Sequence, residues 1–119
     1  MLPFHKGATM HTKRKGDLAE KKALNYLKKI GYSIIEQNYY AKKLGEIDII
    51  ATKNDAYHFI EVKSGSTFDP RQNLSSSKMS KLINSVHLYV KHHRIRKAFC
   101  IDACIIEGDK IEMIENITL

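Results

Sequence analysis

Apolar residues recur at helical spacing, three or four positions apart, in two stretches of the chain. The first stretch covers residues 17–30, and Gly31 suits the position directly after a helix C-terminus. The second opens in the run Ser75–Ser77, whose hydroxyls are candidate N-caps, and reaches about His92. The apolar stripes of the two expected helices are Ala19, Ala23, Leu27 and Ile30 in the first, and Met79, Leu82, Ile83, Val86 and Val90 in the second.

Five further stretches are rich in β-branched and aromatic residues and are predicted as strands. They cover residues 32–40, 47–52, 57–64, 98–106 and 111–114. Short breaks at 53–56 and 107–109 predict two hairpins. A turn is expected at Lys42–Gly45, and the polar stretch Gly65–Leu74, which contains Pro70, is expected to be a loop. The order αβββαββ indicates an α/β domain with a mixed sheet.

Two acids lie in the strands of the first predicted hairpin. If Asn54 and Asp55 form its two-residue turn, the register places Asp48 directly opposite Glu61 on one face of the sheet, with Cβ atoms roughly 4.5–5.5 Å apart. Like charges in apolar strands are costly unless a cation neutralises them. Mg²⁺ is suited to this position because it prefers carboxylate oxygens and water as ligands.

A lysine follows the second acid on the same expected face. Strand alternation places the ammonium of Lys63 beside Glu61, and the carbonyl of Val62 is available as a neutral ligand. Two acids that hold a metal, with a lysine alongside, suit phosphodiester hydrolysis, because the metal activates water and the ammonium stabilises the charged transition state. A hairpin with surface acids paired to Lys63 is the alternative.

The net positive charge of the chain suggests polyanionic partners. The 119 residues include 20 Lys and Arg against 13 Asp and Glu, a net charge of +7, and the isoelectric point is about 9.4. Such a surface favours nucleic acid first and an anionic membrane second, although a solvated lysine-rich surface is the alternative. Residues 1–7 lack the apolar segment of a secretory signal. No run approaches the roughly 18 apolar residues of a membrane-spanning helix, so we expect a cytoplasmic protein.

The length suits one domain, expected at residues 16–119 after a basic and poorly ordered tail at residues 1–15. Cys100 and Cys104 lie four positions apart in an apolar run, too far apart on a strand for a disulfide. We therefore expect both to be buried free thiols in a reducing cytosol.

A second basic segment is a candidate for contact with nucleic acid. Lys42 and Lys43 follow Tyr39 and Tyr40, which could stack on a splayed base while the lysines contact phosphates. Packing of one tyrosine into the core is the alternative. The sequence contains no glycine-rich phosphate loop and no Ser/His/Asp pattern.

The motifs resemble those of a known family. Gly45–Ala51 (GEIDIIA) and Phe59–Lys63 (FIEVK), together with the helix from Gly16 to Leu27, look like the signature of the uncharacterised bacterial YraN family. That family resembles the PD-(D/E)xK superfamily, which includes restriction endonucleases and archaeal Holliday-junction resolvases. The resemblance implies a restriction-endonuclease-like αβββαβ core, in which helices flank a central mixed sheet.

The resemblance also implies roles for individual residues. Asp48, Glu61 and Lys63 match the three motif positions, and Glu20 matches the helical acid that completes the metal site. Lys78 matches a weaker position at the start of the second helix and is expected to contact phosphate. The expected metal ligands are thus Asp48, Glu61, Glu20 and the Val62 carbonyl. The chain departs from the family pattern at Ile47, where the superfamily has Pro, at Ala19, which replaces Gly, and at Ser64–Gly65, where a basic residue is usual.

Three functions follow as hypotheses. The first is a Mg²⁺- or Mn²⁺-dependent endonuclease that acts on DNA, including branched or structured DNA. The second is a non-catalytic nucleic-acid-binding module on a nuclease fold, and the third is a basic protein-interaction domain. A homodimer is compatible with the first, because symmetric substrates suit two-fold symmetric proteins.

Overall fold

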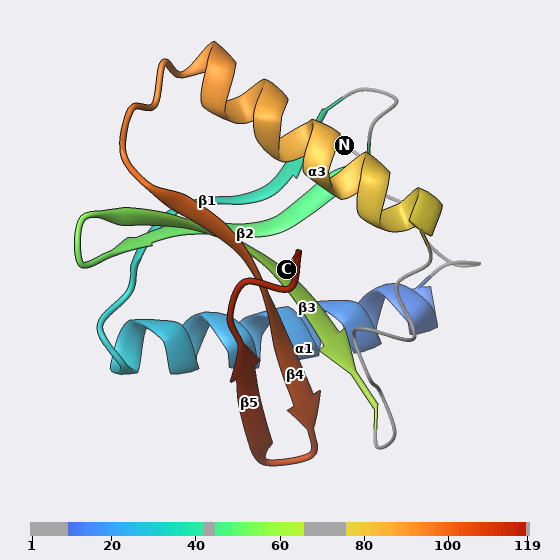
Figure 1. Ribbon diagram of the computed structural model, residues 1–119. Coiled ribbons are helices and arrows are strands. Elements are labelled where there is room, and N and C mark those ends of the chain that lie inside the picture. The colour runs from blue at the N-terminus through green and yellow to red at the C-terminus, as the bar shows by residue number, and fades with distance from the viewer. Residues whose placement is uncertain (1–9, 42–44, 66–75, 119) are drawn as a thin grey trace, which may run out of the picture.

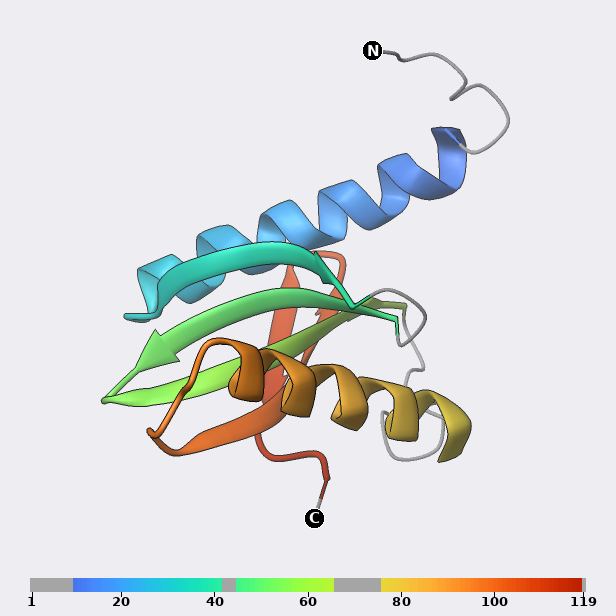
Figure 2. The ribbon, with the colours of Figure 1, turned by 90° about the horizontal axis from the view of Figure 1, so that it is seen from above.

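The computed structural model describes residues 10–41, 45–65 and 76–118, and these form three layers, with a central sheet between two helices (Figures 1 and 2). The helices are α1 (Met10–Lys29) and α3 (Ser76–His92). The strands are β1 (Ser33–Tyr40), β2 (Glu46–Lys53), β3 (Ala56–Ser64), β4 (Phe99–Glu107) and β5 (Lys110–Ile114). Neither helix, within these residues, has the length and apolarity needed to cross a membrane.

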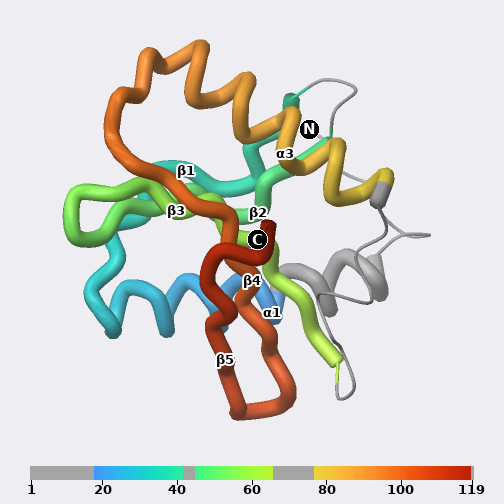
Figure 3. Tube along the Cα trace, in the orientation of Figure 1, coloured from blue at the N-terminus to red at the C-terminus, as the bar shows by residue number. Residues whose placement is uncertain are grey.

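The sheet has the order β1-β2-β3-β4-β5. All neighbouring strands are antiparallel except β3 and β4, which are parallel. Parallel neighbours need a crossover connection, and α3 lies in the segment that returns the chain over one face of the sheet (Figure 3). The predicted α/β class with a mixed sheet between helices is therefore confirmed, as is the element order.

The β2–β3 hairpin has the predicted turn. Asn54 and Asp55 have φ angles of 52° and 63°, which a type I′ turn requires at both central positions. Lys53 pairs with Ala56, and the register continues as predicted as far as Ile49 and Ile60.

The first helix is longer than its apolar pattern indicated. It begins at Met10 rather than Asp17, so residues 10–15 of the predicted basic tail are helical, and residues 1–9 lie outside the described part of the chain. Lysine and arginine have good helix propensity, which favours a helix across Lys13–Lys15, before the apolar stripe begins. Its end is as predicted: Gly31 has φ +103°, and the amide of Tyr32 donates to the carbonyl of Leu27 at 2.9 Å, as in a Schellman motif.

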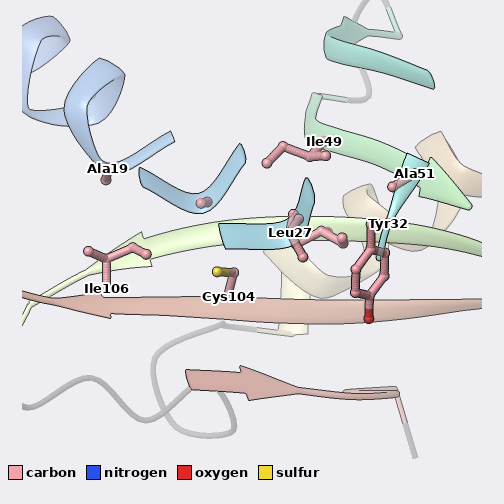
Figure 4. Packing of buried hydrophobic residues seen from close by; sticks show 9 residues of the cluster. Ala19, Leu27, Tyr32, Ile49, Ala51, Cys104 and Ile106 are labelled. Carbon is pink, nitrogen blue, oxygen red and sulfur yellow. The ribbon is translucent and has the colours of Figure 1, made fainter. Parts of the chain in front are cut away.

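Each face of the sheet buries its own core. The core on the α1 side is shown in Figure 4 and comprises Ala19, Ala23, Leu27, Tyr32, Ile49, Ala51, Ile60, Cys104 and Ile106. The core on the α3 side comprises Ile47, Ile50, Phe59, Leu82, Val86, Tyr89 and Ile101. Both cysteines are free thiols as predicted; Cys104 is buried, whereas Cys100 is partly exposed.

Strand alternation is interrupted in β2 at Asp48. A regular strand would place Ile47 and Ile49 on the same face, but Ile47 packs in the α3-side core and Ile49 in the α1-side core. In the neighbouring strand β1, Asn38 has a left-handed φ of 51°. The two adjacent strands therefore depart from regular pleating at the same place, and this irregularity gives Asp48 its position in the site.

Candidate functional site

A cavity of about 440 Å³ opens where the irregular part of the sheet meets both helices. Its charged lining residues come from α1, β2, β3 and α3, so no single hairpin forms it. They are Glu20, Glu46, Asp48, Glu61, Lys63, Lys78 and Lys81. Because the cavity brings four acids and three lysines together, it can hold both a cation and an anionic ligand.

The cavity contains the predicted site residues that the structure describes. Asp48, Glu61, Val62, Lys63, Glu20 and Lys78 all line it. Lys42 and Lys43 lie outside the described residues. Tyr39 and Tyr40, which were candidates for stacking on a base, differ in exposure: Tyr39 packs against the α3-side core, and Tyr40 is 71% exposed. One of the pair packing inward agrees with the alternative considered from the sequence.

Two charged lining residues were not identified from the sequence. Glu46 lies two positions before Asp48, and strand spacing alone could have suggested that it shares the site. Lys81 follows Lys78 by three positions, which places both on one side of a helix.

Asp48 is held by an atom of the neighbouring strand. The regular β2–β3 pairing ends at Ile49 and Ile60, so the prediction that Asp48 and Glu61 form a directly opposed pair is wrong. Instead, the backbone amide of Val62 donates to Asp48 Oδ2 at 2.8 Å. The carboxylate accepts a hydrogen bond in place of a backbone carbonyl, because the interruption in β2 turns the Asp48 side chain toward β3.

Burial makes the charged form of Asp48 unfavourable. Desolvation is the largest influence, the hydrogen bond from Val62 opposes it, and the nearby charge of Glu20 adds to it, so that the pKa of Asp48 rises to about 7. The ammonium of Lys63 acts in the opposite direction and lowers the pKa. The net rise indicates that the protein alone does not fully compensate a negative charge at this position.

Burial also makes the charged form of Glu61 unfavourable. Desolvation and then the charge of Asp48 raise the pKa of Glu61 to about 8, against a lowering influence from Lys63. Glu61 Oε1 is buried and has no hydrogen-bond partner among the described residues. An unpaired buried oxygen is costly, and a bound cation would remove that cost.

The donor atoms fit a hard divalent cation. Carboxylates of Asp48, Glu61 and Glu20 and the carbonyl of Val62 supply only oxygen, which Mg²⁺ and Mn²⁺ prefer. A divalent cation between Asp48 and Glu61 would stabilise the ionised forms of both carboxyl groups, which burial alone makes unfavourable. The residues therefore fit the metal expected from the sequence.

The helical acid is positioned by a side chain from β1. Asn38 Nδ2 donates to Glu20 Oε1 at 3.0 Å, and Asn38 reaches this position from a left-handed backbone conformation, which asparagine tolerates better than most residues. Asn38 was not identified from the sequence, because a contact between β1 and α1 depends on how the helix packs.

Asn38→Gly is expected to weaken Mn²⁺ binding by roughly 10–100-fold, since it removes the amide that orients Glu20 but permits the left-handed φ. Isothermal titration calorimetry measures this effect. Asn54→Gly is the matched control, because Asn54 has a similar φ of 52° in a turn away from the cavity. Equal affinity in the two variants would contradict the role of Asn38.

The family of the chain follows from comparison with known proteins. The sequence model that defines the uncharacterised protein family UPF0102 matches residues 19–106. This span includes every charged residue of the cavity. The chain belongs to UPF0102, the YraN family that its motifs predicted.

Curated relatives match over nearly their whole length. The chain is similar to the UPF0102 protein of Aliarcobacter butzleri, with 50% identity over 109 residues that cover 91% of this chain and 99% of the relative. It is 52% identical over 105 residues to the UPF0102 protein of a Sulfurovum species, covering 87% and 93%. The UPF0102 protein of Helicobacter hepaticus is 46% identical over 110 residues, covering 92% and 99%.

Proposed function

We propose that this protein is a Mg²⁺- or Mn²⁺-dependent nuclease that hydrolyses phosphodiester bonds in DNA. The observation that carries the proposal is the buried acid pair Asp48 and Glu61, with an unpartnered oxygen on Glu61 and the ammonium of Lys63 beside both. Two acids held in this state are costly to the fold, and a divalent cation offsets that cost while it serves catalysis.

Each residue has a defined part in hydrolysis. Asp48, Glu61, Glu20 and the carbonyl of Val62 would hold the metal, which supplies a water of lowered pKa and a Lewis acid for the phosphate oxygen. The interrupted pleat of β2 keeps Asp48 turned toward β3, and the Val62 amide fixes its carboxylate. The Lys63 ammonium orients the attacking water or stabilises the charge that develops on the phosphate oxygens.

The same cavity suits a polyanionic substrate. Lys78 and Lys81 line it from the first turns of α3, where the helix dipole also favours a phosphate. The net charge of +7 favours association with nucleic acid.

Likeness to a known class of nucleases gives additional support by analogy. An αβββαβ core with Asp48 on β2 and Glu-Val-Lys on β3 resembles the PD-(D/E)xK arrangement, in which such residues cut DNA. Enzymes of this kind include junction resolvases, so branched DNA is the first substrate to test.

Metal binding tests the proposal before any substrate is known. In calorimetry, Mn²⁺ should bind the wild-type protein at one oxygen-ligand site, and Asp48→Asn should lose this site because the variant removes a buried charge while it keeps the shape. Asp109→Asn, in the exposed β4–β5 turn, is the matched control and should bind as the wild type does. A wild-type protein that binds neither Mn²⁺ nor Mg²⁺ would refute the proposal.

Cleavage assays separate a nuclease from the alternative binding module. The proposal expects metal-dependent cleavage in a panel of junction, flap, duplex and single-stranded DNA. Salt-sensitive DNA binding that persists in a chelator, with no cleavage of any substrate, would instead favour the non-catalytic module.

A further inference from the structure

A second cluster of ligand-type side chains lies outside the cavity, on β3 and β4. His58 and Cys100 are register partners in the parallel pair, and Asp102 follows Cys100 by two positions on the same face. One donor atom from each of the three lies within 4.8 Å of the others. None of the three residues lines the cavity that holds Asp48.

The three side chains are already in mutual contact. His58 Nδ1 lies 2.7 Å from Asp102 Oδ2, Cys100 Sγ lies 3.2 Å from His58 Nδ1, and Cys100 Sγ lies 3.2 Å from Asp102 Oδ1. Both contacts of the imidazole use the same ring nitrogen, whereas a Cys-His-Asp catalytic triad uses one nitrogen for each partner. The geometry is therefore unsuited to a nucleophilic triad.

The donor set has the chemistry of a zinc site. Sulfur, imidazole nitrogen and carboxylate oxygen together suit Zn²⁺, whereas Mg²⁺ prefers oxygen alone. With metal–ligand bonds of about 2.0–2.3 Å, donor atoms of a tetrahedral zinc site lie about 3.3–3.7 Å apart. The present separations are somewhat shorter, so an ion would enter after a displacement of roughly half an ångström, within reach of side-chain rotation.

Neighbouring groups hold two of the donors in place. Asp102 is fully buried, and its Oδ1 accepts a hydrogen bond of 2.9 Å from the backbone amide of Asn116, which leaves Oδ2 directed at His58. The ring of Tyr32 packs edge-to-face against the His58 ring, with centroids 5.1 Å apart. Such supporting contacts orient the ligands of metal sites.

The cluster is also accessible from solvent, and a further acid lies near it. The His58 side chain is 12% exposed, and Cys100 is partly exposed, so an ion can reach the cluster from solvent. Glu115 lies within electrostatic reach of Cys100 and adds a carboxylate on the segment that follows β5. That segment also supplies the Asn116 amide to Asp102.

We propose that His58, Cys100 and Asp102 bind one Zn²⁺ ion, with Glu115 or water as the fourth ligand. The ion would join β3 and β4, and also the segment after β5 where Glu115 is the fourth ligand, so its binding would stabilise the folded protein. The inference is independent of the proposed nuclease function, because the two sites share no residue.

Cobalt titration of the reduced full-length protein tests the inference. Co²⁺ bound through a thiolate gives a sulfur-to-metal charge-transfer absorption, which the oxygen ligands of the cavity cannot give. The wild-type protein should develop this absorption to saturation at one equivalent, and Zn²⁺ should abolish it. Zn²⁺ should also raise the melting temperature of the wild-type protein, because a ligand that binds only the folded state stabilises it.

Variants identify the ligands. Cys100→Ser and His58→Gln should each lose the absorption and the Zn²⁺-dependent rise in melting temperature. Cys104→Ala is the matched control, because Cys104 is the other thiol of β4 and lies in the α1-side core (Figure 4); this variant should keep both signals. Asp48→Asn should also keep both, which separates this site from the nuclease cavity.

Two results would overturn the zinc site. One is a wild-type protein with no charge-transfer absorption, which would leave His58, Cys100 and Asp102 as a hydrogen-bonded cluster only. The other is absorption that persists in Cys100→Ser but disappears in Cys104→Ala. Circular dichroism of each variant confirms that it is folded, and His58→Gln gives an independent answer if a cysteine variant is not.

Discussion

Asp48→Asn is expected to lower the rate of metal-dependent DNA cleavage by roughly 10³-fold or more. The substitution keeps the size of the side chain and an oxygen that can accept the 2.8 Å hydrogen bond from the Val62 amide, but it removes the charge that holds the metal. Loss of a catalytic metal costs several kcal/mol of transition-state stabilisation, which corresponds to a loss of this size. Single-turnover cleavage of the best DNA substrate in the panel, with saturating Mn²⁺, measures the effect.

Two comparisons make the experiment specific. Asp109→Asn, the same substitution in the exposed turn after β4, should cleave at the wild-type rate. The Lys63→Ala variant should also cleave DNA more slowly than the wild type. It should still bind Mn²⁺, because the ammonium acts on the reacting groups rather than on the metal. If Asp48→Asn retains wild-type cleavage, the chemistry takes place elsewhere in the molecule.

The metal-free protein is expected to lose stability as the pH rises from about 4 to about 8. The folded protein raises the pKa of Asp48 to about 7 and that of Glu61 to about 8, whereas the unfolded chain has ordinary values near 4. Across this range the folded state binds more protons than the unfolded state, so the free energy of unfolding falls with increasing pH. A shift of three pKa units in one group corresponds to about 4 kcal/mol, and coupling between the two acids makes their joint effect less than the sum.

Glu61→Gln should remove much of this dependence. At pH 8 without divalent metal, the variant should be more stable than the wild type by roughly 2–4 kcal/mol, because it replaces a buried charge with a neutral group of the same shape. Thermal unfolding in a chelator measures the difference, which corresponds to a rise in melting temperature of roughly 5–15 °C for a domain of this size.

The same melts separate a metal site from an ordinary buried acid. Mn²⁺ should raise the melting temperature of the wild type at pH 8 and leave Glu61→Gln almost unchanged. Glu112→Gln, an exposed acid on β5, is the control and should behave as the wild type does. A variant that is less stable than the wild type at pH 8 would show that the favourable partners of the Glu61 carboxylate, the Lys63 ammonium and the Asp48 amide, outweigh the cost of its burial.

The two proposed metal sites differ in how far the sequence could reveal them. Asp48, Glu61 and Lys63 stand in strands joined by a two-residue turn, so local register predicted their proximity. His58 and Cys100 are brought together by the parallel pairing of β3 and β4, across a crossover of about 35 residues that includes α3. Parallel pairing carries no local register signal, and therefore no pattern in the sequence suggested that these residues combine.

The irregularity at Asp48 was also beyond local reasoning. Regular alternation predicted that Asp48 pairs directly with Glu61. In the structure the alternation of β2 is interrupted at Asp48, and Asn38 in the neighbouring strand β1 has a left-handed φ. This conformation depends on which faces of β1 and β2 the two helices cover, and those faces are decided by packing on both sides of the sheet.

By itself, the sequence determined the element order, the turn at Asn54 and Asp55, the register of the β2–β3 hairpin as far as Ile49 and Ile60, and the three motif residues of the cavity. Those features follow from periodicity and from turn chemistry, which act over a few residues. Only the tertiary structure decided that Asn38 holds Glu20, that Lys81 joins Lys78 in the cavity, and that burial raises the pKa of both acids. The physical reason is that desolvation and contacts between layers depend on how the helices pack against the sheet, which no short segment of the chain encodes.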